Sequence, residues 1–478
     1  METTSITIFG LTFVALEAAG IAASVHAVMN VRTSQGAVAW AISLITFPFL
    51  AVPLYVVFGS RKFYGYVDAR REGDLEIQHI AMSVSEKYGP VYRASFEGES
   101  LRYDAFERLA KMPFTRANDA ELLVDGAETF GAIFRGIDSA TDYVLVQFYI
   151  VRNDGLGREL KNRLLRKLKA GVRVCFLYDN VGSSALPGSY VEELKAAGAV
   201  VEAFTGYTRR VRRFQINFRN HRKIVVVDGH TAYVGGHNVG DEYLGLDPKL
   251  SPWRDTHVRV TGPSAITVQL SFLEDWYWAC HNVPELSWTP KAASARETKV
   301  LVLPSGPADE LETCGLFFVH AINAARERVW IVSPYFVPDE SVVHALQLAA
   351  LRGIDVRILV PHKADNRLVQ LAACSYFEEM VSVGVNIHSY NEGFLHQKVM
   401  LIDDDIATVG TANFDNRSFR LNFEITMGVA DDDFAGEVRR MLEADFANSR
   451  RIKPAEVTGR NFVYRAAVRA ARLMAPIL

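Results

Sequence analysis

Two stretches of the chain share one signature, and this signature decides the fold. The first is His221-Arg222-Lys223-Ile224-Val225-Val226-Val227-Asp228, and the second is His396-Gln397-Lys398-Val399-Met400-Leu401-Ile402-Asp403. Both read His-x-Lys-x-x-x-x-Asp. A glycine-containing turn follows each copy, and an asparagine comes at the same distance from each histidine, Asn238 in one copy and Asn413 in the other. The repeat therefore extends past the signature and indicates a duplicated domain.

The apolar residues inside each signature predict a strand that is buried on both faces. Because side chains alternate along a strand, His221 and Lys223 should point the same way and lie exposed at the strand's edge. Asp228 should point away from them or lie past the turn. We therefore expect Asp228 and Asp403 to brace their motifs rather than to touch a substrate.

The residue types in the signatures suit phosphate chemistry. Lysine neutralises phosphoryl oxygens, asparagine adds a neutral donor, and histidine attacks phosphorus or moves protons near neutral pH. Displacement at a phosphodiester needs a nucleophile on one side of phosphorus and a general acid on the other, and a pseudo-twofold pair of half-sites supplies both. A single copy would also fit a basic strand end in a solvated loop, but two matched copies disfavour that interpretation. The candidate catalytic residues are His221, Lys223, Asp228, His396, Lys398 and Asp403, supported by Asn238 and Asn413.

A neutral imidazole needs an acceptor on its second nitrogen to fix its tautomer. The motif aspartates are badly placed for this, and acidic residues on a following strand are better candidates. These are Asp255 in the first half and Glu424 in the second. For Asp255 a surface ion pair with Arg254 or Arg259 is the alternative.

The rest of the soluble part also repeats. A strand over 142–149, a helix over 160–170 and a strand over 172–177 are predicted in the first half; the second half repeats them at 329–336, 342–351 and 356–360. This βαβ order predicts an α/β fold with a parallel or mixed sheet covered by helices. We expect a connector without clean periodicity over 63–120 and two domains over 121–290 and 291–460.

The first 62 residues predict two transmembrane helices. Residues 37–58 are mostly apolar and long enough to span a bilayer. Residues 5–31 are a weaker candidate because they contain Glu17 and His26, and an uncleaved signal-like region or a membrane-surface helix is the alternative. We expect an uncleaved hairpin, because no small-residue cleavage site follows a basic region at the N-terminus. Basic residues after the second segment place the catalytic part in the cytoplasm.

Two basic segments are further candidates for lipid contact. The first is a run beside the first signature that is either a solvated loop or a collector of anionic headgroups; it contains Arg209, Arg210, Arg212, Arg213 and Arg219. The second, residues 461–478, predicts a basic amphipathic helix that lies on the bilayer or packs on the body.

Composition narrows the remaining choices. The chain has 478 residues and a formal net charge of −3, which does not favour a nucleic-acid partner. Its four cysteines are scattered, so they indicate buried thiols in a reducing compartment. Clusters at zinc spacing are absent from the sequence, and we expect no metal.

The paired motifs resemble those of the phospholipase D superfamily. The residues that flank them are similar to those of bacterial cardiolipin synthases, and this resemblance covers essentially the whole chain. The stretches that carry the resemblance are Asn220–Lys223, Gly235–Asn238, Asp241–Tyr243, Trp253–His257, Gly410–Ser418 and Asn422–Glu424. The resemblance implies two tandem phospholipase D-like domains related by a pseudo-twofold axis. It also implies metal-independent phosphatidyl transfer through a phosphatidyl-histidine intermediate, without a cofactor, and it supports Glu424 more firmly than Asp255.

The resemblance further implies that one phosphatidylglycerol is the donor and a second the acceptor, giving cardiolipin and glycerol at the bacterial cytoplasmic (inner) membrane. We assign the attack on phosphorus to His221 and the proton transfers to His396, although the near symmetry leaves this choice open. Use of phosphatidylethanolamine as donor and the oligomeric state also stay open. The alternatives are a hydrolase, in which water replaces the acceptor, and an inert lipid-binding scaffold. A nuclease is disfavoured by the membrane segments and the near-neutral charge.

Overall fold

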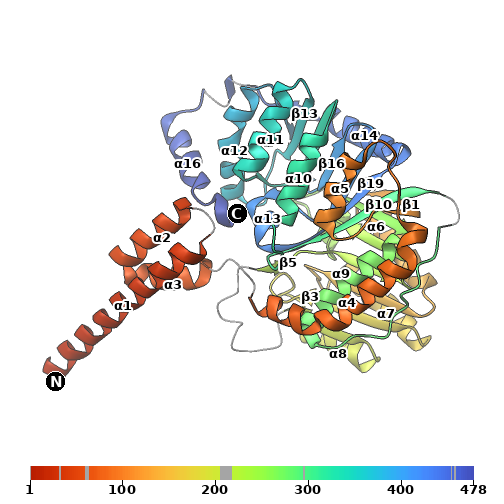
Figure 1. Cartoon of the computed structure of the whole chain (residues 1–478), viewed down its shortest axis with the longest axis horizontal. Coiled ribbons are helices and arrows are strands. Elements are labelled where there is room, and N and C mark those ends of the chain that lie inside the picture. Colours follow the sequence, from red (N-terminus) through yellow and green to blue (C-terminus); the bar gives the residue numbers. More distant parts are fainter. Residues whose placement is uncertain are drawn as a thin grey trace.

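The computed structural model describes residues 2–31, 34–59, 64–204, 218–293, 296–453, 455–456 and 459–478. Three helices at the N-terminus project from one side of a body built around a sheet (Figure 1). They are α1 (Glu2–Asn30), α2 (Ser34–Thr46) and α3 (Pro48–Phe58). One helix segment in the described part of the chain, Leu11–Asn30, is long and apolar enough to cross a membrane.

The second predicted span is not one helix, so this prediction is wrong in detail. The chain breaks at Phe47, whose backbone has φ −136° and ψ 57°. Pro48 explains the break, because proline disfavours the helical conformation at the residue before it and lacks an N–H. Both shorter helices still pack on α1, where His26 Nδ1 lies 2.8 Å from the Tyr55 hydroxyl. His26 therefore faces the partner helices.

The expected connector is largely helical and belongs to the folded body. It contains α4 (Tyr64–Tyr92) and α5 (Ser100–Ala110), and β1 begins at Thr115. Ile77 of α4 packs against Leu270 and Leu273 of α9. The absence of clean periodicity in the sequence hid this helix, because α4 interleaves charged and apolar residues and carries Pro90 within its last turn.

One mixed sheet runs through both halves of the body. The first half contributes β1 (Thr115–Val124), β2 (Tyr143–Phe148), β3 (Arg173–Asp179), β4 (Val200–Phe204), β6 (Ile224–Val227), β7 (Thr231–Gly235) and β9 (Thr256–Thr261). The second half contributes β10 (Thr298–Ser305), β11 (Arg328–Val332), β13 (Asp355–Pro361), β14 (Asn386–Tyr390), β16 (Val399–Ile402), β17 (Ile406–Gly410), β19 (Asn422–Ala430) and the edge strand β20 (Ser449–Arg451).

The strand order is nearly a palindrome about the centre of the sheet. From β1 outward it runs β9, β7, β6, β2, β3 and β4; from β10 outward it runs β19, β17, β16, β11, β13 and β14, with β20 last. Strands β1 and β10 pair antiparallel at the centre. The pairs β2–β3 and β11–β13 are parallel, as the βαβ pattern predicts, and β2–β6 and β11–β16 are antiparallel. The predicted α/β class and mixed sheet are confirmed.

Helices bury both faces of this sheet. On one face lie α9 (Ser264–Cys280) and α14 (Asp432–Ala447), packed on strands of both halves. The opposite face is covered by α6 (Asp125–Ser139), α7 (Gly155–Lys169) and α8 (Gly188–Ala196) in the first half. In the second half it is covered by α10 (Thr313–Ala324), α11 (Glu340–Leu351) and α12 (Arg367–Val381). The predicted strand over 329–336 ends early, at Val332, before Pro334; Phe336–Val337 form the separate strand β12. Two further helices, α13 (Asn416–Arg420) and α16 (Phe462–Arg472), lie near the C-terminus, and short 3-10 turns span Asp241–Leu244 and Ala475–Ile477.

Candidate active site

The two signatures meet because short strands exchange partners between the halves. β5 (Arg219–Asn220) ends just before His221, and it pairs parallel with the start of β19 in the second half. β15 (Phe394–Leu395) ends just before His396, and it pairs parallel with β8 (Trp253–Arg254) in the first half. The backbone N–H of His221 donates to Phe423 O at 2.9 Å, and that of His396 donates to Arg254 O at 2.8 Å. Each half therefore holds the other half's histidine.

The same crossing brings an acid to each imidazole. His221 Nδ1 lies 2.9 Å from Glu424 Oε2, and His396 Nδ1 lies 2.7 Å from Asp255 Oδ2. Both carboxylates have no exposed surface. The surface ion pair considered for Asp255 is wrong, since Arg254 pairs with Asp445 and Asp125 while Arg259 pairs with Glu121. Each half thus supplies the acid for the other half's histidine.

The alternation pattern predicts that the histidines lie exposed at a strand edge, and this prediction is wrong. β6 begins at Ile224 and β16 at Val399, so His and Lys of each signature come before the strand. His221 keeps only 9% of its surface, and the ring of Tyr149 lies 5.1 Å from its ring centre. Trp253 lies 5.0 Å from the ring centre of His396. An aromatic ring therefore packs beside each imidazole.

Burial sets the charge state of the histidines. It lowers the pKa of His221 to about 4, opposed by the Glu424 carboxylate and assisted by Lys223. Burial also lowers the pKa of His396 to about 4, assisted by Lys398 and opposed by Asp255. Both rings are therefore neutral at pH 7. With Nδ1–H donated to a carboxylate, the free lone pair lies on Nε2.

The two lysines are buried beside the histidines. Lys223 Nζ donates to His221 O and Lys398 Nζ to His396 O, each at 2.5 Å. Burial lowers the pKa of Lys223 to about 7 and that of Lys398 to about 8, while Glu424 and Asp255 respectively oppose this effect most. A phosphodiester anion beside these lysines would favour their protonated forms and so raise their pKa.

The two asparagines differ in their contacts. The Asn238 side chain accepts from Ile150 N at 3.0 Å and donates to the Tyr243 hydroxyl at 3.0 Å. Its amide therefore links the backbone at Ile150 to the side chain of Tyr243. Asn413 Nδ2 lies 3.4 Å from Asp415 Oδ2, and its Oδ1 has no hydrogen-bond partner among the described residues. That both asparagines act as neutral donors to phosphate oxygens stays a prediction.

The motif aspartates lie away from the imidazoles and hold the backbone just before β2 in the first half and β11 in the second. Asp228 has φ 51° and accepts three backbone N–H groups, from Thr141, Asp142 and Tyr143. Asp403 has φ 52° and accepts the N–H groups of the three residues from 326 to 328 and a bond from Arg102. These contacts match a bracing role at the start of β2 and β11.

The structure adds two acids that the signature search overlooked. Asp275 on α9 accepts from Gln147 at 2.6 Å and Asn220 at 2.7 Å, and pairs with Arg222 at 2.9 Å. Asp445 on α14 accepts from Gln397 at 3.0 Å. Each holds the residue between the histidine and the lysine of one signature, Arg222 in the first and Gln397 in the second. Their sequence signal is an aspartate directly before a core aromatic residue near the end of a helix, Trp276 in one case and Phe446 in the other.

Of the basic run beside the first signature, one residue is described. Arg219 lies on β5, and its charge acts on Tyr149 and Arg417 near His221. Arg209, Arg210, Arg212 and Arg213 lie outside the described residues. Groups of three or more His, Cys, Asp or Glu side chains that could hold a metal ion do not occur in the described part of the chain.

Two His-x-Lys motifs whose histidines share one buried, acid-lined site define the phospholipase D superfamily. A solved phosphatidylserine synthase from Haemophilus influenzae Rd KW20 has a similar fold, with a TM-score of 0.59 and 17% identity over 79% of this chain and all of that one. Residues 133–248 and 318–446 match the family described as cardiolipin synthase, PLD-like domain.

Curated relatives extend this match over nearly the full length. Cardiolipin synthase A of Pseudomonas putida (strain W619) is 50% identical over 98% of both chains. Cardiolipin synthase A of Pseudomonas aeruginosa (strain UCBPP-PA14) is 48% identical over 99% of this chain and 97% of the relative. The chain belongs to the bacterial cardiolipin synthase family, and its enzyme class is that of the phosphatidyltransferases.

Proposed function

We propose that the protein joins two phosphatidylglycerol molecules into cardiolipin, with release of glycerol, at the site shared by the two halves. The observation that carries the proposal is the crossed pairing of His221 with Glu424 and of His396 with Asp255. It puts two oriented imidazoles, one from each signature, in one buried site. The names of the family and of the curated relatives support the substrate class.

In the first step, Nε2 of His221 attacks the phosphorus of the donor lipid. The bond between phosphorus and the glycerol headgroup oxygen breaks, and His396 gives that oxygen a proton. The anionic phosphodiester favours the protonated form of a neighbouring imidazole, which supplies the acid. The products of this step are free glycerol and a phosphatidyl group on His221.

In the second step, neutral His396 takes the proton from a glycerol hydroxyl of the acceptor lipid. The acceptor oxygen attacks phosphorus, and the bond to His221 breaks. Lys223 and Lys398 neutralise the non-bridging oxygens while charge builds up in both transition states. No metal or cofactor takes part in this scheme, and the reverse assignment of the two histidines has the same chemistry.

The finer features of the fold belong to the same proposal. We place a pseudo-twofold axis between β1 and β10, with tandem domains over 121–290 and 291–460. We place α1 across the bacterial inner membrane, with α2 and α3 against it as the returning part of a hairpin and the body in the cytoplasm. The apolar character of Leu11–Asn30 supports this placement.

The test is a product analysis with purified, detergent-solubilised protein, labelled phosphatidylglycerol and a metal chelator. We expect cardiolipin and glycerol in equal amounts. Phosphatidic acid as the sole lipid product would make the enzyme a hydrolase. Turnover that survives in both His221→Gln and His396→Gln would rule out the proposed site, whereas lipid binding without any turnover by the unmodified protein would indicate a scaffold.

A further inference from the structure

The C-terminal helix α16 packs on the body through one face only. Val468 and Ala471 are buried. Arg472 donates to Ser375 O at 3.3 Å and pairs with Glu379 on α12 at 3.0 Å. The outward face is apolar, with Phe462 83% and Val463 75% exposed, and Leu473 just beyond the helix is 81% exposed. Large apolar side chains grouped on a surface in this way are typical of an interaction site.

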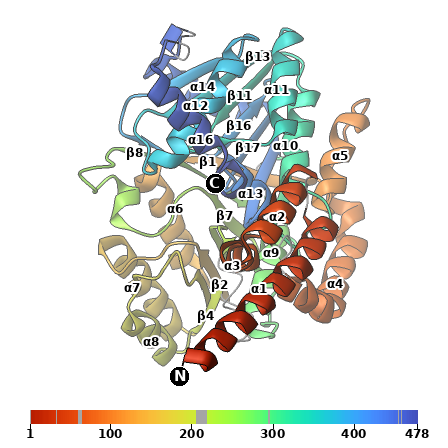
Figure 2. The ribbon, with the colours of Figure 1, turned by 90° about the vertical axis from the view of Figure 1, so that its left-hand side faces the viewer.

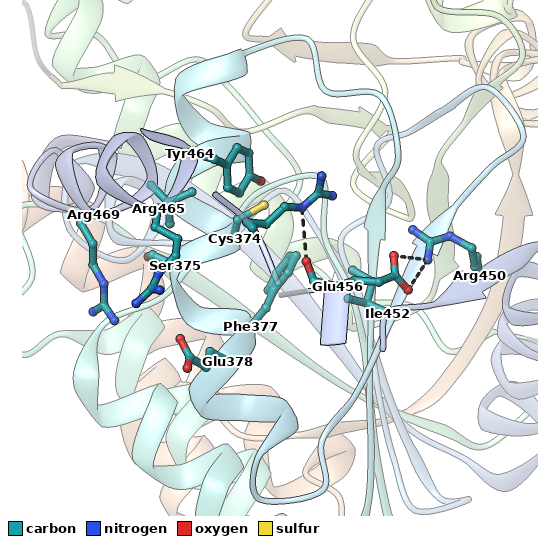
Figure 3. A pocket seen from close by; sticks show the side chains of 12 residues that line it. Cys374, Ser375, Phe377, Glu378, Arg450, Ile452, Glu456, Tyr464, Arg465 and Arg469 are labelled. Atoms are coloured by element: carbon teal, nitrogen blue, oxygen red, sulfur yellow. Dashed lines mark hydrogen bonds and ion pairs between the residues drawn. The ribbon is translucent and has the colours of Figure 1, made fainter. Parts of the chain in front are cut away.

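A row of arginines flanks this apolar face. A cavity of about 120 Å³ lies beneath α16. Figure 3 shows Arg465 and Arg469 among the side chains that line it. Two other arginines of the lining are engaged by one residue: Arg450 pairs with the Glu456 carboxylate at 2.6 Å, and Arg460 Nε donates to Glu456 O at 3.2 Å. Arg465 and Arg469 form no ion pair with a described residue, so their charge is free to meet an anion.

The position of α16 indicates which anionic surface it meets. Helix α16 and the helices α1–α3 lie on the same side of the body (Figures 1 and 2). α1 also exposes large apolar residues, including Leu11 at 66% and Val14 at 65%. At the end of the segment that follows α16, Leu478 O accepts the backbone N–H of Arg417 at 3.0 Å, so this end is held against α13 in the second half.

We propose that α16 is a second membrane contact that reads anionic phospholipid. Phe462, Val463 and Leu473 enter the boundary between headgroups and acyl chains, and Arg465 and Arg469 bind lipid phosphates beside them. The apolar face favours contact with a bilayer, and the two arginines favour a bilayer that contains anionic lipid. The contact holds the catalytic body at a fixed height and tilt on the bilayer.

The test places a tryptophan at the proposed contact in the full chain. Three proteins are reconstituted in bilayer discs with brominated acyl chains, which quench tryptophan fluorescence: Phe462→Trp, the control Arg166→Trp and the unmodified protein. The unmodified protein gives the signal of the six native tryptophans. Arg166 is 57% exposed on α7, which lies on the opposite side of the body from α1 (Figure 1). We expect excess quenching for Phe462→Trp alone, and severalfold more with phosphatidylglycerol than with phosphatidylcholine discs.

A charge variant separates the lipid contact from simple proximity. In the Phe462→Trp background, Arg465→Gln with Arg469→Gln should remove most of the phosphatidylglycerol-dependent quenching, while the matched pair Arg158→Gln with Arg166→Gln on α7 should not. Quenching no greater than that of Arg166→Trp, as expected if another protein or only water covers α16, would overturn the proposal. Quenching that ignores both lipid charge and the two arginines would also overturn it. Because cardiolipin synthesis is not the readout, this result is independent of the proposed reaction.

Discussion

Single residues from one half complete the chemistry of the other half. Besides its contact with His221, Glu424 accepts a hydrogen bond from the Thr411 hydroxyl at 2.6 Å; besides its contact with His396, Asp255 accepts one from the backbone N–H of the next residue, Thr256, at 2.8 Å. The halves are therefore similar but not identical in how they hold the orienting acid. Strand patterns in the sequence singled out both acids, but they did not show that the pairs cross, because crossing depends on long-range pairing of two-residue strands.

Glu424→Gln should lower kcat by about a thousandfold or more, because an amide can donate to Nδ1 and hold the wrong tautomer of His221. The protein should remain folded, since the side-chain volume is kept. Cardiolipin formation and circular dichroism measure the two effects. The matched control is Glu443→Gln, which changes a 46% exposed glutamate on α14. Equal activity of the two variants would contradict the assigned role.

Asp228→Ala should lower the free energy of unfolding by about 3 kcal/mol, because three backbone N–H groups lose a charged acceptor. Alanine is also disfavoured at φ 51°. Folded Asp228→Ala protein should keep kcat within about threefold of the unmodified enzyme, since the carboxylate does not touch the histidine. Denaturant titration with Glu310→Ala, an exposed position, is the control. A variant of unchanged stability but no activity would mean that Asp228 acts in catalysis.

At the scale of elements, local pattern predicts the regular parts well. The βαβ units of the structure lie where the sequence predicts them from apolar runs and from the glycines that precede β3 and β13, Gly171 and Gly353. Three features escaped prediction. The two-residue strands β5 and β15 have no periodicity to detect, the α2–α3 break depends on one proline, and the helix α4 lacks a clean apolar stripe. Each depends on tertiary contacts or on one residue rather than on a repeated pattern.

Gly236→Ala tests how closely the turn after β7 approaches the orienting acid. A Cβ at this position would lie 2.0 Å from Asp255 Oδ1, so the carboxylate must move away from His396. We expect at least a hundredfold loss of kcat with a smaller loss of stability. Gly436→Ala on α14 is the control, because its Cβ would meet only Arg440 Nη1 at 3.6 Å. Activity equal to that of this control would show that Asp255 need not be held in place.

At the scale of the whole molecule, one sheet and one buried site make the halves interdependent. The histidines, lysines and carboxylates of both halves act on one another electrostatically. The sequence predicts that the halves are duplicated. It does not predict how deeply their shared site is buried, because burial follows from packing the two halves together.

Acid should destabilise the protein through this site. The folded pKa of His221 and His396 is about 4, below the ordinary value of 6.5. Between pH 6.5 and 4 the unfolded chain therefore binds more protons, and the free energy of unfolding falls as pH falls. His221→Gln with His396→Gln should flatten this slope in denaturant titrations at a series of pH values. A slope that the double variant leaves unchanged would mean that other groups cause it.

The central claim is that one histidine of the shared site carries the phosphatidyl group while the other moves protons. The most direct measurement is mass spectrometry of the protein, quenched at alkaline pH during turnover of labelled phosphatidylglycerol. We predict a phosphatidyl adduct on His221 of the unmodified enzyme during turnover, and no such adduct in His221→Ala. An adduct on His396 would exchange the two roles within the same scheme. Cardiolipin formation with no adduct on either histidine would contradict the account.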